Sequence, residues 1–153
     1  MSQATVGRPM EILLVEDNLE DARMTIQALR SEGVRCRVTL VCDGEEAMEF
    51  LRRSGVFARA PRPDMILLDL ELPRLNGRQV LSEVRADPSL EGIPVVVLTG
   101  SLVQQTLLQA EPLRVDGFMT KPVSLEQFIA VVKSMRRSWL AELVLPSLES
   151  SRS

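Results

Sequence analysis

Four short segments of the sequence that we interpret as strands each end in side chains that could do chemistry together. In chain order, the residues that follow these segments are Glu16 and Asp17, then Asp69, then Thr99, then Lys121. Carboxylate oxygens in this number select a hard cation such as Mg²⁺ or Mn²⁺. An ammonium and a hydroxyl beside that cation supply the charge and the hydrogen bonds that a tetrahedral dianion needs. The combination predicts a site for a phosphoryl group.

Taken one at a time, these side chains have plainer explanations. An acid that follows a strand often caps the next helix or loop, which would account for Glu16, Asp17 or Asp69. Thr99 could be an ordinary loop hydroxyl, and Lys121 could be a solvated turn residue. The shared site is favoured by their positions, because the carboxyl ends of parallel strands meet at one edge of a sheet.

The distribution of apolar residues predicts the α/β fold that would bring these ends together. Three segments are wholly apolar, as strands buried on both faces are, and a fourth alternates as an edge strand would. Helical spacing recurs between the strands, which favours parallel crossovers in a doubly wound sandwich with helices on both faces of the sheet. The strands are expected over 12–15, 35–41, 65–68, 93–98 and 115–119, and the helices over about 19–31, 44–53, 76–86, 103–110 and from 124 towards Trp139.

Composition narrows the classes of function. The 153 residues are about one domain long, and the net charge of −3 argues against nucleic acid as a partner. No apolar run approaches the roughly 20 residues needed to cross a membrane, and 1–9 does not resemble a leader. With two cysteines and no histidine, a cytoplasmic, reducing setting is expected, and histidine-based catalysis is excluded.

The sequence resembles the receiver domain of two-component response regulators from Glu11 to about Arg137. The resemblance rests on the motifs ILLVEDN at 12–18, ILLDLELP at 66–73, Gly77, VVVLT at 95–99, and Lys121-Pro122. It implies five parallel strands in the flavodoxin-like order 2-1-3-4-5 with five helices, a three-layer sandwich. The segments 60–64 and 87–94 also resemble the single-domain regulators that partner cyanobacterial and bacterial phytochromes.

The resemblance also implies roles for individual residues. Asp69 would be the phosphoacceptor, supplied by a phosphohistidine on a sensor histidine kinase, with a bacterial phytochrome as a candidate. Because the chain has no histidine, the phosphate would have to arrive from another protein. The remaining implied roles are Mg²⁺ or Mn²⁺ binding by Glu16, Asp17, Asp69 and the backbone carbonyl of Glu71, phosphate binding by Lys121, Thr99 and Gly100, switching by Thr99 and Phe118, and a cis bond between Lys121 and Pro122.

Three further expectations concern details that could vary within the family. Phe118 could equally be a plain core residue, since inward burial is one state of a switch aromatic. The carboxylate of Glu71 is expected to alter the phosphate lifetime, because uncharged residues are common at that place. The chain is expected to catalyse only its own phosphorylation and dephosphorylation, and otherwise not to be an enzyme.

The expected division of the chain is a flexible 1–9, a receiver domain over 10–138 and an apolar extension over 139–153 that leaves no room for an output domain. The extension could pack on its own domain. Alternatively, it could join the fourth helix, the fifth strand and the fifth helix in a homodimer contact.

Two other classes of protein use part of the same residue set. A haloacid-dehalogenase-like phosphatase also has a strand-end Asp, with Glu71 in the place of its second acid, but it needs an acidic pair after the lysine that the sequence lacks. A pseudo-receiver would bind partners without being phosphorylated. Its mark would be a missing acceptor, lysine or acid pair, and all of these are present.

Overall fold

The computed structural model describes residues 9–30, 35–70, 72, 76–100 and 114–135. Within these residues strand and helix alternate along the chain up to residue 100, as predicted, and a further strand and helix lie within 114–135. The elements are β1 (Met10–Val15), α2 (Leu19–Leu29), β2 (Cys36–Val41), α3 (Gly44–Arg52), the 3-10 turn η1 (Gly55–Phe57), β3 (Met65–Asp69), α4 (Gly77–Ala86), β4 (Val95–Thr99), β5 (Gly117–Thr120) and α6 (Leu125–Ser134).

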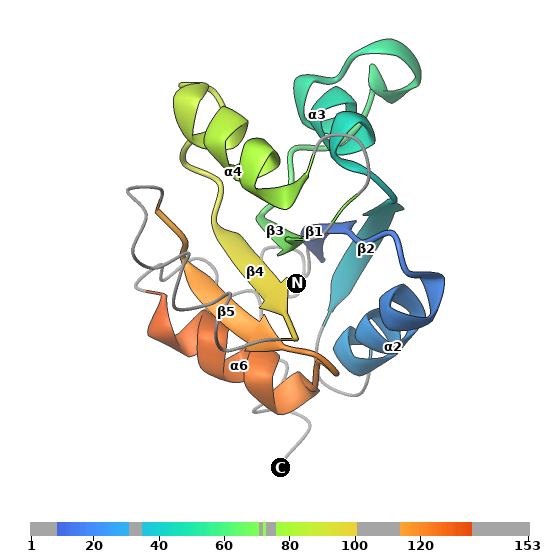
Figure 1. Ribbon diagram of the computed structural model, residues 1–153, viewed down its shortest axis with the longest axis vertical. Coiled ribbons are helices and arrows are strands. Elements are labelled where there is room, and N and C mark those ends of the chain that lie inside the picture. The colour runs from blue at the N-terminus through green and yellow to red at the C-terminus, as the bar shows by residue number, and fades with distance from the viewer. Residues whose placement is uncertain (1–8, 31–34, 71, 73–75, 101–113, 136–153) are drawn as a thin grey trace, which may run out of the picture.

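The five strands form one parallel sheet in the order β2-β1-β3-β4-β5 (Figure 1). The flavodoxin-like order 2-1-3-4-5 is therefore confirmed. All residues of β3 and β4 are buried, as wholly apolar central strands predict, whereas β2 at the edge is only half-buried along most of its length. The register sets Val15 of β1 beside Leu68 of β3, so the residues that follow them reach the same edge of the sheet.

Helices cover both faces of the sheet, and the sheet separates the core into two layers. The helices α3 and α4 lie over one face, and α2 and α6 lie over the other (Figure 1). Side chains of each strand alternate between the layers: Leu68 packs on the α3 and α4 side, whereas Leu67 packs on the α2 and α6 side. The doubly wound, three-layer sandwich is thus confirmed. The weak helix expected at about 103–110 lies outside the described residues.

Side-chain caps set where the helices begin. Asn18 Oδ1 accepts a hydrogen bond from Asp21 N at 3.0 Å, and Asp43 Oδ1 accepts one from Glu46 N at 2.7 Å. These bonds satisfy backbone donors that the first turn of a helix leaves unpaired. The helix α4 has a full capping box, in which Asn76 and Gln79 bond each other's backbone N–H groups.

The last described helix is shorter than the sequence predicts. It ends at Ser134, and Met135 has an extended backbone with ψ of 125°. Ser134 Oγ donates a hydrogen bond to the Val131 carbonyl at 2.8 Å. Met135 N also bonds the carbonyls of Val131 and Val132, which closes the last turn. Because Met135 itself has an extended backbone, the prediction that the helix continues through Met135 is wrong. The prediction for Trp139 and the apolar extension falls on residues that the structure does not describe.

Candidate functional site

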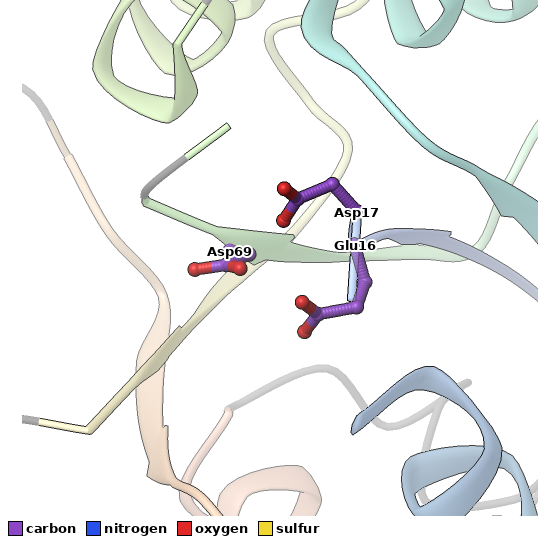
Figure 2. Close-up of side chains that lie close together, drawn as sticks. All are labelled: Glu16, Asp17 and Asp69. Atoms are coloured by element: carbon purple, nitrogen blue, oxygen red, sulfur yellow. The ribbon is translucent and has the colours of Figure 1, made fainter. Parts of the chain in front are cut away.

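Three carboxylates meet at the carboxyl edge of the sheet. Glu16 and Asp17 directly follow β1, and Asp69 is the last residue of β3. Each offers a carboxylate oxygen, and the three oxygens lie within 4.8 Å of one another. Figure 2 shows the carboxyl groups of Glu16 and Asp17 turned towards that of Asp69. The structure therefore brings together the acids that the sequence placed at neighbouring strand ends.

The acids after β1 are not the caps of the next helix. That position belongs to Asn18, whose side chain accepts from Asp21 N. Glu16 is fully buried and its Oε2 accepts a hydrogen bond from Asn18 N at 3.2 Å, while Asp17 is exposed. Because Asn18 satisfies the helix, both acids remain available to the site, and the plainer explanation as helix caps does not hold for them.

Lys121 directly follows β5, the strand at one edge of the sheet, and its side chain reaches the acids from there. Its Nζ lies 2.9 Å from Glu16 Oε1, 3.1 Å from Asp69 Oδ2 and 3.3 Å from Asp21 Oδ2. The backbone is held as well, because Lys121 N donates to the Thr99 carbonyl at 3.0 Å. The Lys121–Pro122 peptide bond is cis, as the resemblance implied. Lys121 is thus a site residue and not a solvated turn lysine.

Two residues of the site neighbourhood were missed by sequence reasoning. Asp21, in the first turn of α2, contacts the Lys121 ammonium. Gln127, in the first turn of α6, bonds both neighbours of the lysine: its Oε1 accepts from Thr120 N at 2.9 Å, and its Nε2 donates to the carbonyls of Thr120 and Pro122, each at 3.1 Å. Neither Asp21 nor Gln127 was assigned to the site from the sequence.

Burial and crowding of like charges shift the protonation of the site. Burial, and then the neighbouring Asp69, raise the pKa of Glu16 to about 7, against the lowering effect of Lys121. Burial alone would lower the pKa of Lys121, but its contacts with Glu16 and Asp69 outweigh burial and hold that pKa above its usual value. The lysine is therefore charged at neutral pH, and the raised pKa means that Glu16 keeps its proton to a higher pH than an ordinary glutamate does.

The donor set fits a divalent cation. Glu16 Oε1 is buried, and its close contact among the described residues is the ion pair with Lys121 Nζ at 2.9 Å. A buried carboxylate oxygen is costly unless a cation satisfies it. Together with the oxygens of Asp17 and Asp69, it forms an all-oxygen set of the kind that Mg²⁺ and Mn²⁺ take.

The other residues assigned by the sequence lie around this cluster. Thr99 ends β4 and is buried, next to the exposed Gly100. Phe118 of β5 is half-buried and packs against the core layer under α3 and α4. Glu71, whose backbone carbonyl was expected to bind the cation, lies outside the described residues.

At Gly77, α4 packs closely against the strand end that carries Asp69. Its N–H donates to the Leu70 carbonyl at 3.1 Å. A Cβ at this position would overlap the Asp69 carbonyl oxygen and lie 2.6 Å from Leu70 Cα. Only glycine permits this approach, so the Gly77 in the resemblance has a physical reason.

The fold and the site together define a class of protein. The family model described as "Response regulator receiver domain" matches residues 12–133. The chain belongs to this family and is a receiver domain of a two-component phosphorelay. The alternative of a haloacid-dehalogenase-like phosphatase is wrong. Among the described residues, no helix has the length and apolar character to cross a membrane.

Within the family, the chain is similar to regulators associated with phytochromes. It is 37% identical over 139 residues to the response regulator Rcp1 of Synechocystis sp., covering 91% of this chain and 95% of that protein. Among solved structures, the bacteriophytochrome response regulator AtBRR has a TM-score of 0.79 at 36% identity, covering 84% of this chain and 93% of that one.

Two further solved structures are of relatives in a phosphorylated and in a metal-bound form. The phosphorylated cyanobacterial phytochrome response regulator RcpA has a TM-score of 0.71 at 43% identity, covering 88% of this chain and 96% of that one. The Mn²⁺-bound form of Rcp1 has a TM-score of 0.69 at 38% identity, covering 86% and 95%.

Proposed function

We propose that Asp69 is the phosphoacceptor of this receiver domain and that Lys121 and a divalent cation assist the transfer. The observation that carries the proposal is the 3.1 Å contact between Lys121 Nζ and Asp69 Oδ2 inside the acidic cluster. Asp69 is the last residue of β3, and its carboxylate lies at the carboxyl edge of the sheet with the side chain 10% exposed. The phosphorylated RcpA supports the assignment by analogy.

The proposed reaction is a single displacement at phosphorus. A carboxylate oxygen of Asp69 attacks, the bond between phosphorus and the donor's imidazole nitrogen breaks, and that nitrogen keeps the electron pair. Lys121 stabilises negative charge on the phosphoryl oxygens, because its ammonium already lies on the Asp69 side of the cluster. The chain catalyses its own phosphorylation and dephosphorylation and no other reaction.

Glu16, Asp17 and Asp69 would hold the cation, with the Glu71 carbonyl as a proposed fourth ligand. When bound, Mg²⁺ or Mn²⁺ would neutralise charge on the phosphoryl oxygens. The all-oxygen donor set and the burial of Glu16 support this assignment, and the Mn²⁺-bound form of Rcp1 agrees with it.

Thr99 and Phe118 are the proposed switch. Thr99 ends the strand next to β3, and β4 pairs with β5 through Val97 and Phe118. Phosphate on Asp69 would be bonded by the Thr99 hydroxyl and the Gly100 backbone. A shift of Thr99 would leave room for Phe118, which is already only half-buried.

The proposed donor is a sensor histidine kinase, and its docking surface is proposed to include α2. Leu19 and Met24 of this helix are 67% and 46% exposed although they are large and apolar. The helix starts three residues after Glu16, so a partner bound there would be beside the site. A phytochrome kinase is the favoured donor because AtBRR and RcpA are phytochrome response regulators.

A homodimer through β5, α6, the 103–110 segment and the apolar extension is a separate proposal.

Phosphoramidate tests the proposal without a cognate kinase, because it carries the same phosphorus–nitrogen bond as phosphohistidine. The chain is incubated with phosphoramidate and Mg²⁺, and the phosphorylated fraction is separated on a phosphate-affinity gel. A shifted band that needs Mg²⁺ and is lost in Lys121→Met and Asp69→Asn supports the proposed roles. No shifted band in the wild type would support the alternative of a pseudo-receiver.

A further inference from the structure

Lys121 has one carboxylate partner that does not belong to the cation cluster. Its Nζ lies 3.3 Å from Asp21 Oδ2, with hydrogen-bond geometry. The acids whose oxygens gather within 4.8 Å are Glu16, Asp17 and Asp69, and Asp21 is not among them. Asp21 comes from the first turn of α2, where the Asn18 cap holds its backbone N–H.

The ammonium and a divalent cation compete for the same oxygens. Lys121 is paired with Glu16 and Asp69, and both of these acids would have to turn oxygens towards a bound cation. An ammonium has three N–H donors and stays close to anions when it is partly buried. The Lys121 side chain is 21% exposed, so water alone does not replace the partners that it gives up.

We infer that Asp21 is a positioning residue that holds Lys121 in the site while the cation takes the oxygens of Glu16 and Asp69. The inference rests on the proposed function, because Asp21 would position a lysine that acts beside a bound cation. Asp21 keeps a carboxylate partner for the ammonium outside the metal cluster. It thereby lowers the cost of loading the metal and leaves Lys121 aimed at the place where a phosphoryl oxygen arrives.

The alternative is that Asp21 acts only through its charge, as any acid near a cation would. Its neighbour Glu20 offers the matched control. Glu20 is in the same first turn and has the same charge, but it pairs with Arg23 at 3.4 Å, with its side chain 73% exposed. An effect of charge alone would also appear in Glu20→Gln and would not depend on Lys121.

Binding of Mn²⁺ alone tests the inference, with free Mn²⁺ counted by electron paramagnetic resonance. Asp21→Asn is expected to weaken Mn²⁺ affinity roughly two- to fivefold, the range of one partly exposed ion pair. Glu20→Gln is expected to change it much less, and Asp21→Glu to restore part of the loss. In a Lys121→Met background, the effect of Asp21→Asn on Mn²⁺ affinity should shrink to the size of the Glu20→Gln effect, because the lysine that Asp21 positions is absent.

Two results would overturn the inference. One is an Asp21→Asn effect that is the same with and without Lys121, and the other is an effect no larger than that of Glu20→Gln. Chemical denaturation in EDTA of each variant checks that the fold is intact and measures the coupling of Asp21 to Lys121 without metal. Neither readout needs phosphate, so a failure of Asp69 to accept phosphate would be seen separately from a failure of this inference.

Discussion

Lys121 Nζ lies 3.1 Å from Asp69 Oδ2, although the two residues are 52 positions apart in the sequence. The contact spans the carboxyl ends of β3 and β5, with β4 between them. The parallel arrangement makes this possible, because both strands deliver their last residues to the same edge. Lys121 brings a positive charge to two acids of the cluster, Glu16 and Asp69, so the behaviour of the site depends on it.

Replacement of Lys121 by Met is expected to destabilise the metal-free protein. The buried acids Glu16 and Asp69 would lose their shared cation, which should lower the free energy of unfolding in EDTA by about 2 kcal/mol. Millimolar Mg²⁺ should recover part of the loss, because it supplies positive charge to the same oxygens. Lys133→Met is the control, since Lys133 is exposed on α6. Equal losses in the two variants, or no effect of Mg²⁺, would contradict the account.

The contact of Gly77 with the strand end predicts a sensitive glycine. Gly77→Ala places a Cβ on the Asp69 carbonyl and on Leu70, and the shift needed should cost about 1–3 kcal/mol of unfolding free energy. Gly92→Ala is the matched control, because its nearest contact would be the Arg62 guanidinium at 4.0 Å. Thermal and urea unfolding of the two variants gives the comparison. If Gly77→Ala were as stable as Gly92→Ala, the packing of α4 on the Asp69 strand end would be wrong.

The hydrogen bonds of Gln127 predict that α6 holds the backbone around Lys121. Gln127→Leu keeps the size of the side chain but removes the bonds to Thr120 and Pro122. Because these backbone groups belong to exposed residues and can turn to water, we expect a loss of about 0.5–1.5 kcal/mol of unfolding free energy. Glu126→Gln, at the exposed neighbouring position, should change stability little. Amide hydrogen exchange should speed up at Thr120 in Gln127→Leu alone; unchanged exchange there would argue against the role.

The raised pKa of Glu16 predicts an unusual pH dependence of stability. Its pKa is about 7 in the fold against an ordinary 4.5, so the folded state keeps a proton that the unfolded chain releases. The contribution of Glu16 to the stability of the metal-free protein should therefore be greatest below about pH 4.5. It should be lost as the pH rises through about 7. Denaturation in EDTA between about pH 5 and pH 8 measures it, and the absence of histidine removes the usual competing group.

Glu16→Gln is the control for this pH effect. It cannot titrate, so its stability should be nearly flat over the same range. Saturating Mg²⁺ should flatten the wild-type curve too, because the cation competes with the proton. A Glu16→Gln curve that ran parallel to the wild type in EDTA would assign the pH dependence to another group.

Much of this site could be predicted because wholly apolar strands give a clear signal. The segments that end in Glu16, Asp69, Thr99 and Lys121 mark the strand ends, and parallel pairing then brings those ends together. Asp21 and Gln127 could not be found in the same way. They lie on helices, and whether a helical side chain reaches the site depends on how the cap and the packing rotate the helix, which periodicity alone does not specify.

The ends of helices were also hard to predict. The apolar pattern runs on past Ser134, but the serine hydroxyl bonds a carbonyl of the last turn and the backbone leaves the helix at Met135. A pattern of apolar residues records which face is buried and not where the hydrogen bonding stops. The same limit applies to β5, which starts at Gly117 and not at Val115, because the Asp116 carboxylate takes the Val95 N–H at the entry to the strand.

The most direct test of the account is the intact mass of the chain after incubation with acetyl phosphate and Mg²⁺. We expect the wild type to gain the mass of one phosphoryl group, the gain to be absent in EDTA, and Asp69→Asn to gain nothing. A wild type that never gains this mass, or an Asp69→Asn chain that gains it to the same extent, would contradict the assignment of Asp69 as the phosphoacceptor.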